Sequence, residues 1–324
     1  MTGGLPGVAV VLPGESGVVS GMADAWLTDE YARAVADEAS DIVGRDVAEW
    51  WRDPLNLRDP AAAHVEVVVT GVAGYRSLIH HGLRPLVVAG HGVGEYAALV
   101  AAGALCLDQV VELVHERAEL LALTPRPDCA GMAAVIGPGA GEVARAVVAQ
   151  VANGGPLAVA SVDGPEQVVL SGGREELARA RDAVVAAGLA MTRLPGRAAC
   201  HGPLMRPVAA HLAVPLADLD WSVPDVAVVP NVDARPTRDP DRLARCLREH
   251  LTSPVQWEAT SRALVEAGAT SVVEVGAVPV LGPLIQQVQP DLPVHLVCGR
   301  GAAIPTEQLP EPALAGPAAT RGET

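Results

Sequence analysis

Phenylalanine and lysine are absent from this chain of 324 residues, and aromatic residues make up only 2% of it. Both absences indicate a GC-rich bacterial genome, because the codons of these residues are AT-rich. The 23 basic residues are therefore all arginines, and 38 acidic residues bring the formal net charge to −15. An acidic chain without a basic run is a poor binder of nucleic acid and is repelled by anionic membrane surfaces. Half of the residues are hydrophobic, which excludes an intrinsically disordered chain.

Other missing features restrict the cellular setting. The five cysteines are scattered, with no pair in CxxC spacing, so we expect reduced cytosolic thiols. Residues 1–7 contain no basic side chain and no long apolar stretch, which argues against a signal peptide. No uninterrupted apolar run reaches the roughly 18 residues of a membrane-spanning helix, and no cluster has the spacing of metal ligands. We therefore expect a cytoplasmic monomer that binds neither metal nor membrane.

Short apolar runs followed by helical periodicity predict a parallel α/β sheet at both ends of the chain. Its expected strands are 8–11, 85–89, 271–275 and 294–297. The expected helices are 22–51, 61–81, 93–102, 107–123, 203–213, 240–251 and 256–268. Residues 129–197 instead follow the order β-α-β-β-α-β of a ferredoxin-like unit. The predicted fold class is α/β, with a hydrolase-like large subdomain (1–128 and 198–301), an inserted ferredoxin-like small subdomain (129–197) and a disordered tail (302–324).

A sharp turn between a predicted strand and a predicted helix has the sequence Gly90-His91-Gly92-Val93-Gly94. Small residues frame its centre, as in the nucleophile elbow G-x-S-x-G, where the tight turn exposes the central side chain at a helix N-terminus. Backbone N–H groups there, including that of Val93, can stabilise an oxyanion. The central residue here is Gly92, so this position has no side chain that could attack a thioester.

Further motifs match a known family in order along the chain. Over about residues 8–300 the chain resembles the malonyl-CoA:acyl carrier protein transacylase family, which includes the acyltransferase domains of polyketide synthases. The matching segments are Leu12-Pro13-Gly14-Glu15-Ser16, Gly90-His91-Gly92-Val93-Gly94-Glu95, His115-Glu116-Arg117, Gly131-Met132-Ala133-Ala134-Val135, His201-Gly202-Pro203-Leu204-Met205, Asn231-Val232-Asp233-Ala234, Ser253-Pro254-Val255-Gln256-Trp257 and Val273-Glu274-Val275-Gly276. Each motif is weak alone, but the ordered set is specific.

The resemblance implies a ping-pong acyl transfer from an acyl-CoA to the phosphopantetheine thiol of an acyl carrier protein, with no permanently bound cofactor. In the family a serine at the elbow attacks the thioester. His201 matches the catalytic base, and Arg117 matches the residue that pairs with the free carboxylate of a malonyl group. A hydroxyl needs such a base at neutral pH, and a guanidinium suits a carboxylate. The expected partners are an acyl carrier protein and, beyond it, a ketosynthase.

The departures from the family pattern fall on the chemistry. Gly92 replaces the serine, Glu15 replaces a glutamine of the oxyanion hole, and His250 replaces another glutamine near the active-site histidine. A carboxylate at Glu15 would repel a developing oxyanion unless burial keeps it protonated. Two further segments differ from the family pattern, Asp163-Gly164 and Ala198-Ala199-Cys200. The second of these lies at the family's acyl-selecting motif.

The retained residues can serve chemistry or structure. His201 is either a base that acts on water or a bound thiol, or an inherited histidine without a role. Arg117 either binds a carboxylate or lies on a helix surface, paired with a neighbouring glutamate. Cys200, beside His201, is a candidate substitute nucleophile away from the elbow. His91 and Glu95 are expected to maintain the shape of the turn, and His91 and Cys200 join Arg117 as candidate substrate-binding residues.

Three functions remain open on the sequence alone. The first is a catalytically degenerate binding module that recognises a carrier protein or ketosynthase through arginines of the small subdomain, namely Arg174, Arg179, Arg181, Arg193 and Arg197. The second is an acyl thioesterase in which His201 activates water. The third is an active acyltransferase whose serine has been changed to Gly92 for study. Natural degeneracy is favoured, because Glu15, Gly92 and His250 all differ from the family and a deliberate knock-out needs one change.

Overall fold

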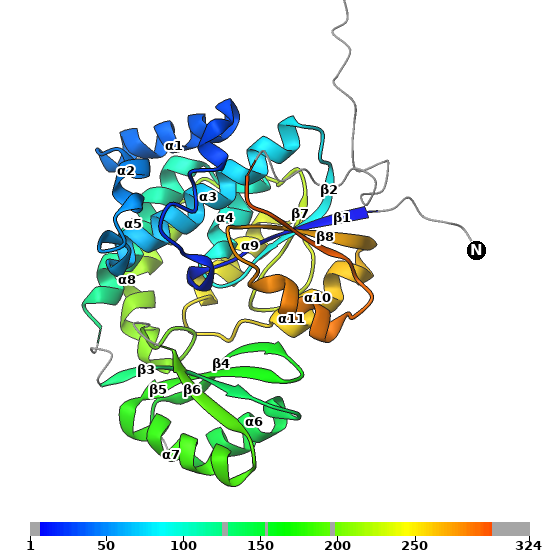
Figure 1. Cartoon of the computed structure of the whole chain (residues 1–324). Coiled ribbons are helices and arrows are strands. Elements are labelled where there is room, and N and C mark those ends of the chain that lie inside the picture. The colour runs from blue at the N-terminus through cyan, green and yellow to red at the C-terminus, as the bar shows by residue number, and fades with distance from the viewer. Residues whose placement is uncertain (1–6, 125–128, 153–154, 195–197, 300–324) are drawn as a thin grey trace, which may run out of the picture.

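Five parallel strands form the larger of two sheets in the computed structural model, which describes residues 7–124, 129–152, 155–194 and 198–299 (Figure 1). The strands lie in the order β7–β2–β1–β8–β9. Their bounds are β1 (Gly7–Leu12), β2 (Pro85–Gly90), β7 (Ala227–Val229), β8 (Ala269–Val275) and β9 (Val294–Val297). Val8 and Val10 belong to one core cluster, whereas Ala9 and Val11 belong to another. Both faces of the sheet are therefore buried, as expected for parallel strands.

Helices cover the two faces of this sheet (Figure 1). One face packs against α1 (Glu30–Val43), α2 (Val47–Arg52), α3 (Pro60–His80), α4 (Gly94–Ala101), α5 (Leu107–Ala122), α8 (Arg206–Ala217) and α9 (Pro240–Glu249). The other face packs against α10 (Trp257–Glu266) and α11 (Leu281–Val288). The long helix α3 contacts α1, α4 and α5. It begins where the Asp59 side chain accepts the Ala61 N–H and Pro60 occupies the first turn, a favourable start for a helix.

The single helix expected over 22–51 is wrong, because the structure has a 3-10 turn (Trp26–Thr28) followed by the two helices α1 and α2. The side chains of Asp29 and Asp46 accept backbone N–H groups in the first turns of α1 and α2. Gly44, with φ +74°, follows the last residue of α1. These caps interrupt an apolar periodicity that continues through the segment. The sequence also gave no indication of β7 or α11.

The second sheet is antiparallel and has the order β4–β5–β3–β6. Its strands are β3 (Ala130–Ile136), β4 (Leu157–Gly164), β5 (Gln167–Gly173) and β6 (Ala190–Leu194). α6 (Ala140–Val151) and α7 (Arg174–Ala186) cover one face, where Val135 and Leu170 are buried. Met132 and Val169, on the other face, join the core of the larger part. The chain order β3-α6-β4-β5-α7-β6 is the predicted one, and the α/β fold class with separate parallel and antiparallel sheets is confirmed.

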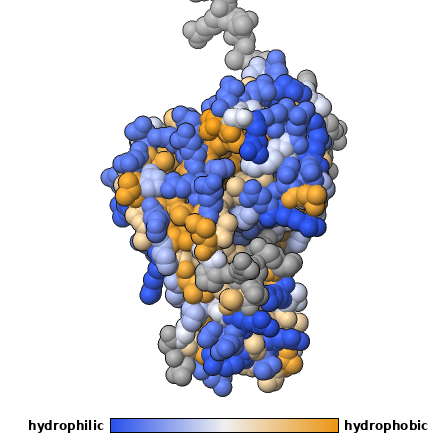
Figure 2. All heavy atoms as spheres, turned by 90° about the vertical axis from the view of Figure 1, so that its left-hand side faces the viewer, coloured by the Kyte–Doolittle hydropathy of each residue, from blue (hydrophilic) through white to orange (hydrophobic). Residues whose placement is uncertain are grey.

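The two sheets lie in a larger and a smaller lobe, and polar side chains cover most of the face seen in Figure 2, with apolar ones in small groups. The strands of the smaller sheet run from residue 130 to residue 194, within the predicted subdomain 129–197, whose bounds stay a prediction. The predicted disordered tail, 302–324, lies outside the described residues. Among the helices that the structure describes, none is long and apolar enough to cross a membrane.

Candidate active site

A cavity of about 390 Å³ lies between the carboxyl ends of β1 and β2 and the smaller sheet. Ligands of open parallel sheets bind at this edge, beyond the carboxyl ends of the strands. Seven of the predicted site residues line the cavity: Glu15, His91, Gly92, Val93, Arg117, Cys200 and His201. The eighth, His250, is fully buried and contacts the turn at Gly92. The fold therefore brings Glu15 and His201, which are 186 positions apart in the sequence, to the same cavity.

The turn after β2 has the geometry of a nucleophile elbow. Gly92 at its centre has φ +55°, in the left-handed region that favours glycine. A Cβ at Gly90 would lie 2.0 Å from the Gly94 carbonyl oxygen, so the first glycine of the motif is required. A Cβ at Gly92 would have His201 Nε2 as its nearest described atom, at 3.8 Å. The centre of the elbow thus has room for a side chain beside a histidine.

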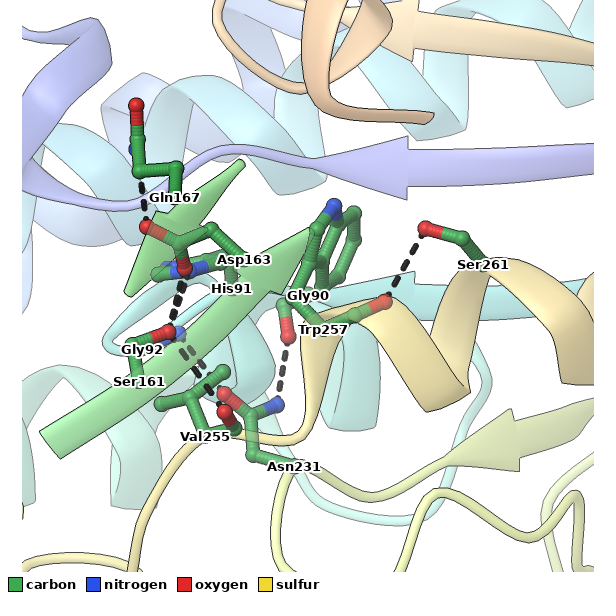
Figure 3. Close-up of polar contacts among 10 residues, drawn as sticks. All are labelled: Gly90, His91, Gly92, Ser161, Asp163, Gln167, Asn231, Val255, Trp257 and Ser261. Carbon is green, nitrogen blue, oxygen red and sulfur yellow. Dashed lines mark hydrogen bonds and ion pairs between the residues drawn. The ribbon is translucent and has the colours of Figure 1, made fainter. Parts of the chain in front are cut away.

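Asn231 fixes the backbone of this turn (Figure 3). Its Oδ1 accepts the Gly92 N–H at 2.8 Å, and its side-chain amide donates to the Gly90 carbonyl oxygen at 2.5 Å. Its backbone N–H donates to Glu95 Oε2 at 3.1 Å. Burial raises the pKa of Glu95 to about 8, so its carboxyl is protonated at neutral pH. The sequence indicated Asn231 only as part of a matching segment, without this role.

His201 presents a proton acceptor to the empty centre of the elbow. Its Nδ1 lies 2.8 Å from the His250 carbonyl oxygen, which can only accept, so Nδ1 carries the proton. Nε2 is then unprotonated and is the atom nearest to the missing Cβ of Gly92. Burial lowers the pKa of His201 to about 4, despite the hydrogen bond to His250. A neutral imidazole with a free lone pair is the form that a general base needs.

His250 connects this histidine to the elbow. Its Nε2–H donates to the Gly92 carbonyl oxygen at 3.0 Å, while its own carbonyl accepts from His201. Burial lowers the pKa of His250 well below the usual value for histidine, and a proton on His201 would lower it further. His250 is therefore neutral, and it positions both the turn and the base without reaching the cavity.

Val93 supplies a backbone donor at the start of α4. The N–H groups of Gly94 and Glu95 donate to the carbonyls of His91 and Gly92. The Val93 N–H has no acceptor in the part of the chain that the structure describes, and Val93 lines the cavity. A donor at this place matches the oxyanion position of a nucleophile elbow.

Arg117 is buried, with 2% of its surface exposed, and so does not lie on the helix surface as one of the two expectations held. Its Nη1–H donates to His64 Nδ1 at 3.0 Å. Because arginine only donates, the His64 proton is on Nε2, which donates to Glu15 Oε1. The Glu15 side chain is 30% exposed and contacts His64, so burial does not isolate its carboxyl group from water. His64 was missed, and its place within a long apolar helix gave no signal.

A second polar group lies on the cavity wall around Asp163 (Figure 3). Asp163 Oδ1 accepts from His91 Nε2 at 3.0 Å, and Oδ2 accepts from Gln167 Nε2 at 2.9 Å. The hydroxyl of Ser161 also donates to Oδ1. Burial opposes the charge of Asp163, but the hydrogen bond and charge of His91 outweigh it and lower the pKa of this carboxyl. Trp257 packs edge-on against the His91 ring, so His91 is held by the wall.

Cys200 lies in the wall of the cavity with 8% of its surface exposed and packs within the main core cluster. These neighbours are largely apolar, and the role of Cys200 as a substitute nucleophile stays a hypothesis. No group of three or more potential metal ligands occurs among the described residues.

The sequence matches the profile of the acyl transferase domain over residues 19–300. It is 32% identical over 290 residues to the malonyl CoA-acyl carrier protein transacylase of Escherichia coli (strain K12), covering 86% of this chain and 92% of that protein. The structure of an acyl carrier protein S-malonyltransferase from Vibrio cholerae is similar with a TM-score of 0.86 at 30% identity, over 91% of this chain and 98% of the other. A malonyl-transacylase in complex with its type II polyketide synthase acyl carrier protein has a TM-score of 0.86 at 29% identity, over 91% and 97%.

Proposed function

Because the chain belongs to the acyl transferase domain family, we propose that it is a transacylase-like protein of fatty-acid or polyketide biosynthesis that binds acyl thioesters without forming an acyl-enzyme. The observation that carries this proposal is Gly92 at the centre of an otherwise complete elbow. The base, the backbone donor and the cavity are present, so a thioester has a place to bind. The nucleophile that would take the acyl group is missing, and losing one member of such a unit removes most of the rate.

The partner that we propose is an acyl carrier protein, as in the related complex with a carrier protein. Carrier proteins are acidic, so their docking surface should be basic. Arg174, Arg179, Arg181 and Arg193 are exposed on α7 and β6 of the smaller lobe, whereas Arg197 lies outside the described residues. Arg179 is paired with Glu176 at 3.2 Å and Arg174 also has an interaction within the chain, so Arg181 and Arg193 are the better candidates for a contact.

The test combines intact-protein mass spectrometry with a binding measurement. The purified chain is incubated with malonyl-CoA and other acyl-CoAs, and we expect no mass adduct and no release of free CoA. Titration with a fluorescently labelled acyl carrier protein should show saturable binding, weakened by Arg181→Glu/Arg193→Glu but not by Arg262→Glu, an exposed arginine on α10. An acyl adduct on the unchanged chain would contradict the proposal.

A second candidate function is thioester hydrolysis, favoured by the open space between His201 Nε2 and Gly92. Water placed there would attack the carbonyl carbon as its proton passes to Nε2, with the oxyanion on the Val93 N–H. The C–S bond would then break, and the thiolate would take the proton back from His201. Release of free acid and CoA that is abolished by His201→Gln would favour this function over simple binding.

The same geometry also bears on the origin of Gly92. If an engineered change had removed the serine of an active acyltransferase, the other departures from the family would still have to permit catalysis. Recovery of full acyl transfer to a carrier protein by Gly92→Ser would support that origin. Persistent inactivity would support natural degeneracy, with Glu15 and His250 as the residues to examine next.

A further inference from the structure

Arg117, at one end of the cavity, is connected through a histidine to a carboxylate of the protein. The guanidinium donates to His64, and His64 donates to Glu15, whose carboxylate lines the cavity. The arginine is thus connected to a carboxylate that belongs to the protein. We propose that the cavity selects acyl groups without a free carboxylate, with Glu15 as the specificity-determining residue and His64 as the residue that positions it. This inference rests on the proposed function, that the cavity binds acyl thioesters.

The orientation of His64 determines which of its ring nitrogens contacts Arg117 and which contacts Glu15. His64 is 1% exposed and lies between the two charged groups. Its Nδ1 accepts from Arg117, so its Nε2 must donate, and Glu15 accepts that proton as a carboxylate can. A bound ligand with its own carboxylate would have to displace Glu15 from this chain of hydrogen bonds. Glu15 is attached to the protein, and an intramolecular partner has an effective concentration that a free ligand rarely matches.

The charge on the rest of the cavity wall also disfavours a ligand with a free carboxylate. Asp163 is a second carboxylate on the wall, and its hydrogen bonds keep it ionised. His91 lies 3.0 Å from Asp163 and is held by this contact. A ligand carboxylate would therefore meet two protein carboxylates, while Arg117 and His91 already form hydrogen bonds with side chains of the protein. Like charges in a partly buried site repel strongly, because water screens them poorly.

The remaining wall suits an uncharged acyl chain. Apolar side chains from both lobes line the cavity, namely Met132, Ala134, Val169, Leu194, Val280, Leu281 and Leu284. Burying an aliphatic chain against such a surface is favourable by the hydrophobic effect. The charged and apolar parts of the cavity therefore both favour a neutral acyl group over a malonyl-type group.

The test compares malonyl-CoA with acetoacetyl-CoA, a probe in which a methyl group replaces the charged oxygen of the malonyl carboxylate. Binding to the unchanged protein is measured by isothermal titration calorimetry, and the integrity of each thioester is checked by chromatography afterwards. We expect acetoacetyl-CoA to bind at least about tenfold more tightly, a difference of about 1.4 kcal/mol. Equal binding of the two thioesters, or tighter binding of malonyl-CoA, would overturn the inference.

Glu15→Gln assigns the effect to this side chain. It keeps the shape of Glu15 while removing the charge, and we expect it to reduce the preference for acetoacetyl-CoA by at least about tenfold, chiefly through tighter binding of malonyl-CoA. Glu112→Gln, an exposed residue of the same helix as Arg117, is the matched control and should leave the ratio unchanged. A ratio that Glu15→Gln does not alter would also overturn the inference. If CoA, both thioesters and the carrier protein all fail to bind, the proposed function fails as well.

Discussion

Replacing Gly92 by serine tests whether the rest of the site is competent. The added Cβ has space, because the nearest described atom is His201 Nε2 at 3.8 Å. The serine hydroxyl would extend from it toward a neutral imidazole whose lone pair is free to accept the proton. The Val93 N–H has no acceptor among the described residues and can receive the oxyanion. We therefore expect Gly92→Ser to become acylated by acyl-CoA, which is only the first half of a full acyl transfer to a carrier protein.

Two magnitudes follow from the geometry. A non-glycine residue at φ +55° costs about 1–2 kcal/mol of backbone strain. For a chain of this size that corresponds to a fall in Tm of roughly 1.5–3 °C. Restoring the nucleophile should raise the acylation rate by at least about three powers of ten, which is about 4 kcal/mol of activation free energy.

The assay is intact-protein mass spectrometry at timed intervals after mixing with malonyl-CoA or acetoacetyl-CoA. Gly92→Ala is the matched control, since it has the same strain and the same Cβ but no hydroxyl. Both variants should lose similar thermal stability, and only Gly92→Ser should gain an acyl adduct. If the two variants label equally slowly, the site is incomplete beyond its nucleophile. If neither loses stability, the interpretation of Gly92 as a strained position is wrong.

Three further predictions concern buried polar residues. Asn231→Ala leaves the buried Gly92 N–H and Gly90 carbonyl without their partner. Urea unfolding should therefore show that the free energy of unfolding falls by about 2–4 kcal/mol. A fall of less than about 1 kcal/mol would contradict the role given to Asn231. Burial raises the pKa of Glu66 to about 8, and neither of its carboxyl oxygens has a partner in the described part of the chain. Between pH 4.5 and 8 the folded state holds a proton on Glu66 that the unfolded state releases, so this group destabilises the fold as the pH rises. Glu66→Gln should therefore be more stable than the parent above pH 8, by on the order of 4 kcal/mol. At pH 4.5 the two proteins should be nearly equal in stability. Thermal unfolding across this pH range checks the convergence, and a difference independent of pH would refute it. Because burial holds the pKa of His201 near 4, the acylation rate of Gly92→Ser should stay constant from about pH 5 to 7 and fall only as the pH drops through about 4. A fall in the rate near pH 6.5, the ordinary pKa of histidine, would show that His201 is not in this environment.

Much of the fold could be predicted because strong local patterns specify it. Strand β9 has the predicted bounds, and the elements of the smaller lobe follow the predicted order, since these elements are periodic or apolar runs between clear breaks. The segment 22–51 failed because caps at Asp29 and Asp46 divide a continuous apolar pattern. Strand β7 has three residues and pairs only with β2 within the described sheet. Such a short strand is defined by its neighbour in space, and no local periodicity can reveal it.

In the site, too, residues defined by a local sequence motif could be predicted, whereas residues brought together only by folding could not. The elbow around Gly92 could be recognised because its glycines are needed by the turn itself. His64 could not, since it is 49 residues from Glu15 and 53 from Arg117 and meets them only in the folded chain. In the sequence it is a single histidine in a run of apolar residues. Its proximity to two charged groups is a property of how α3, α5 and the end of β1 pack together.

Glu15 remains the residue whose two possible effects can be separated by one double variant. As a carboxylate near the oxyanion position it would slow acylation by every thioester, whereas as the partner of Arg117 it would act on malonyl-CoA alone. In the Gly92→Ser background, Glu15→Gln distinguishes these effects through the acylation rates with malonyl-CoA and acetoacetyl-CoA. Because His64 directs the Glu15 carboxylate toward Arg117, we expect the malonyl rate to rise by about tenfold and the acetoacetyl rate to change by less than about twofold. An equal rise for both thioesters would assign Glu15 to the oxyanion and contradict its role in selecting the acyl group.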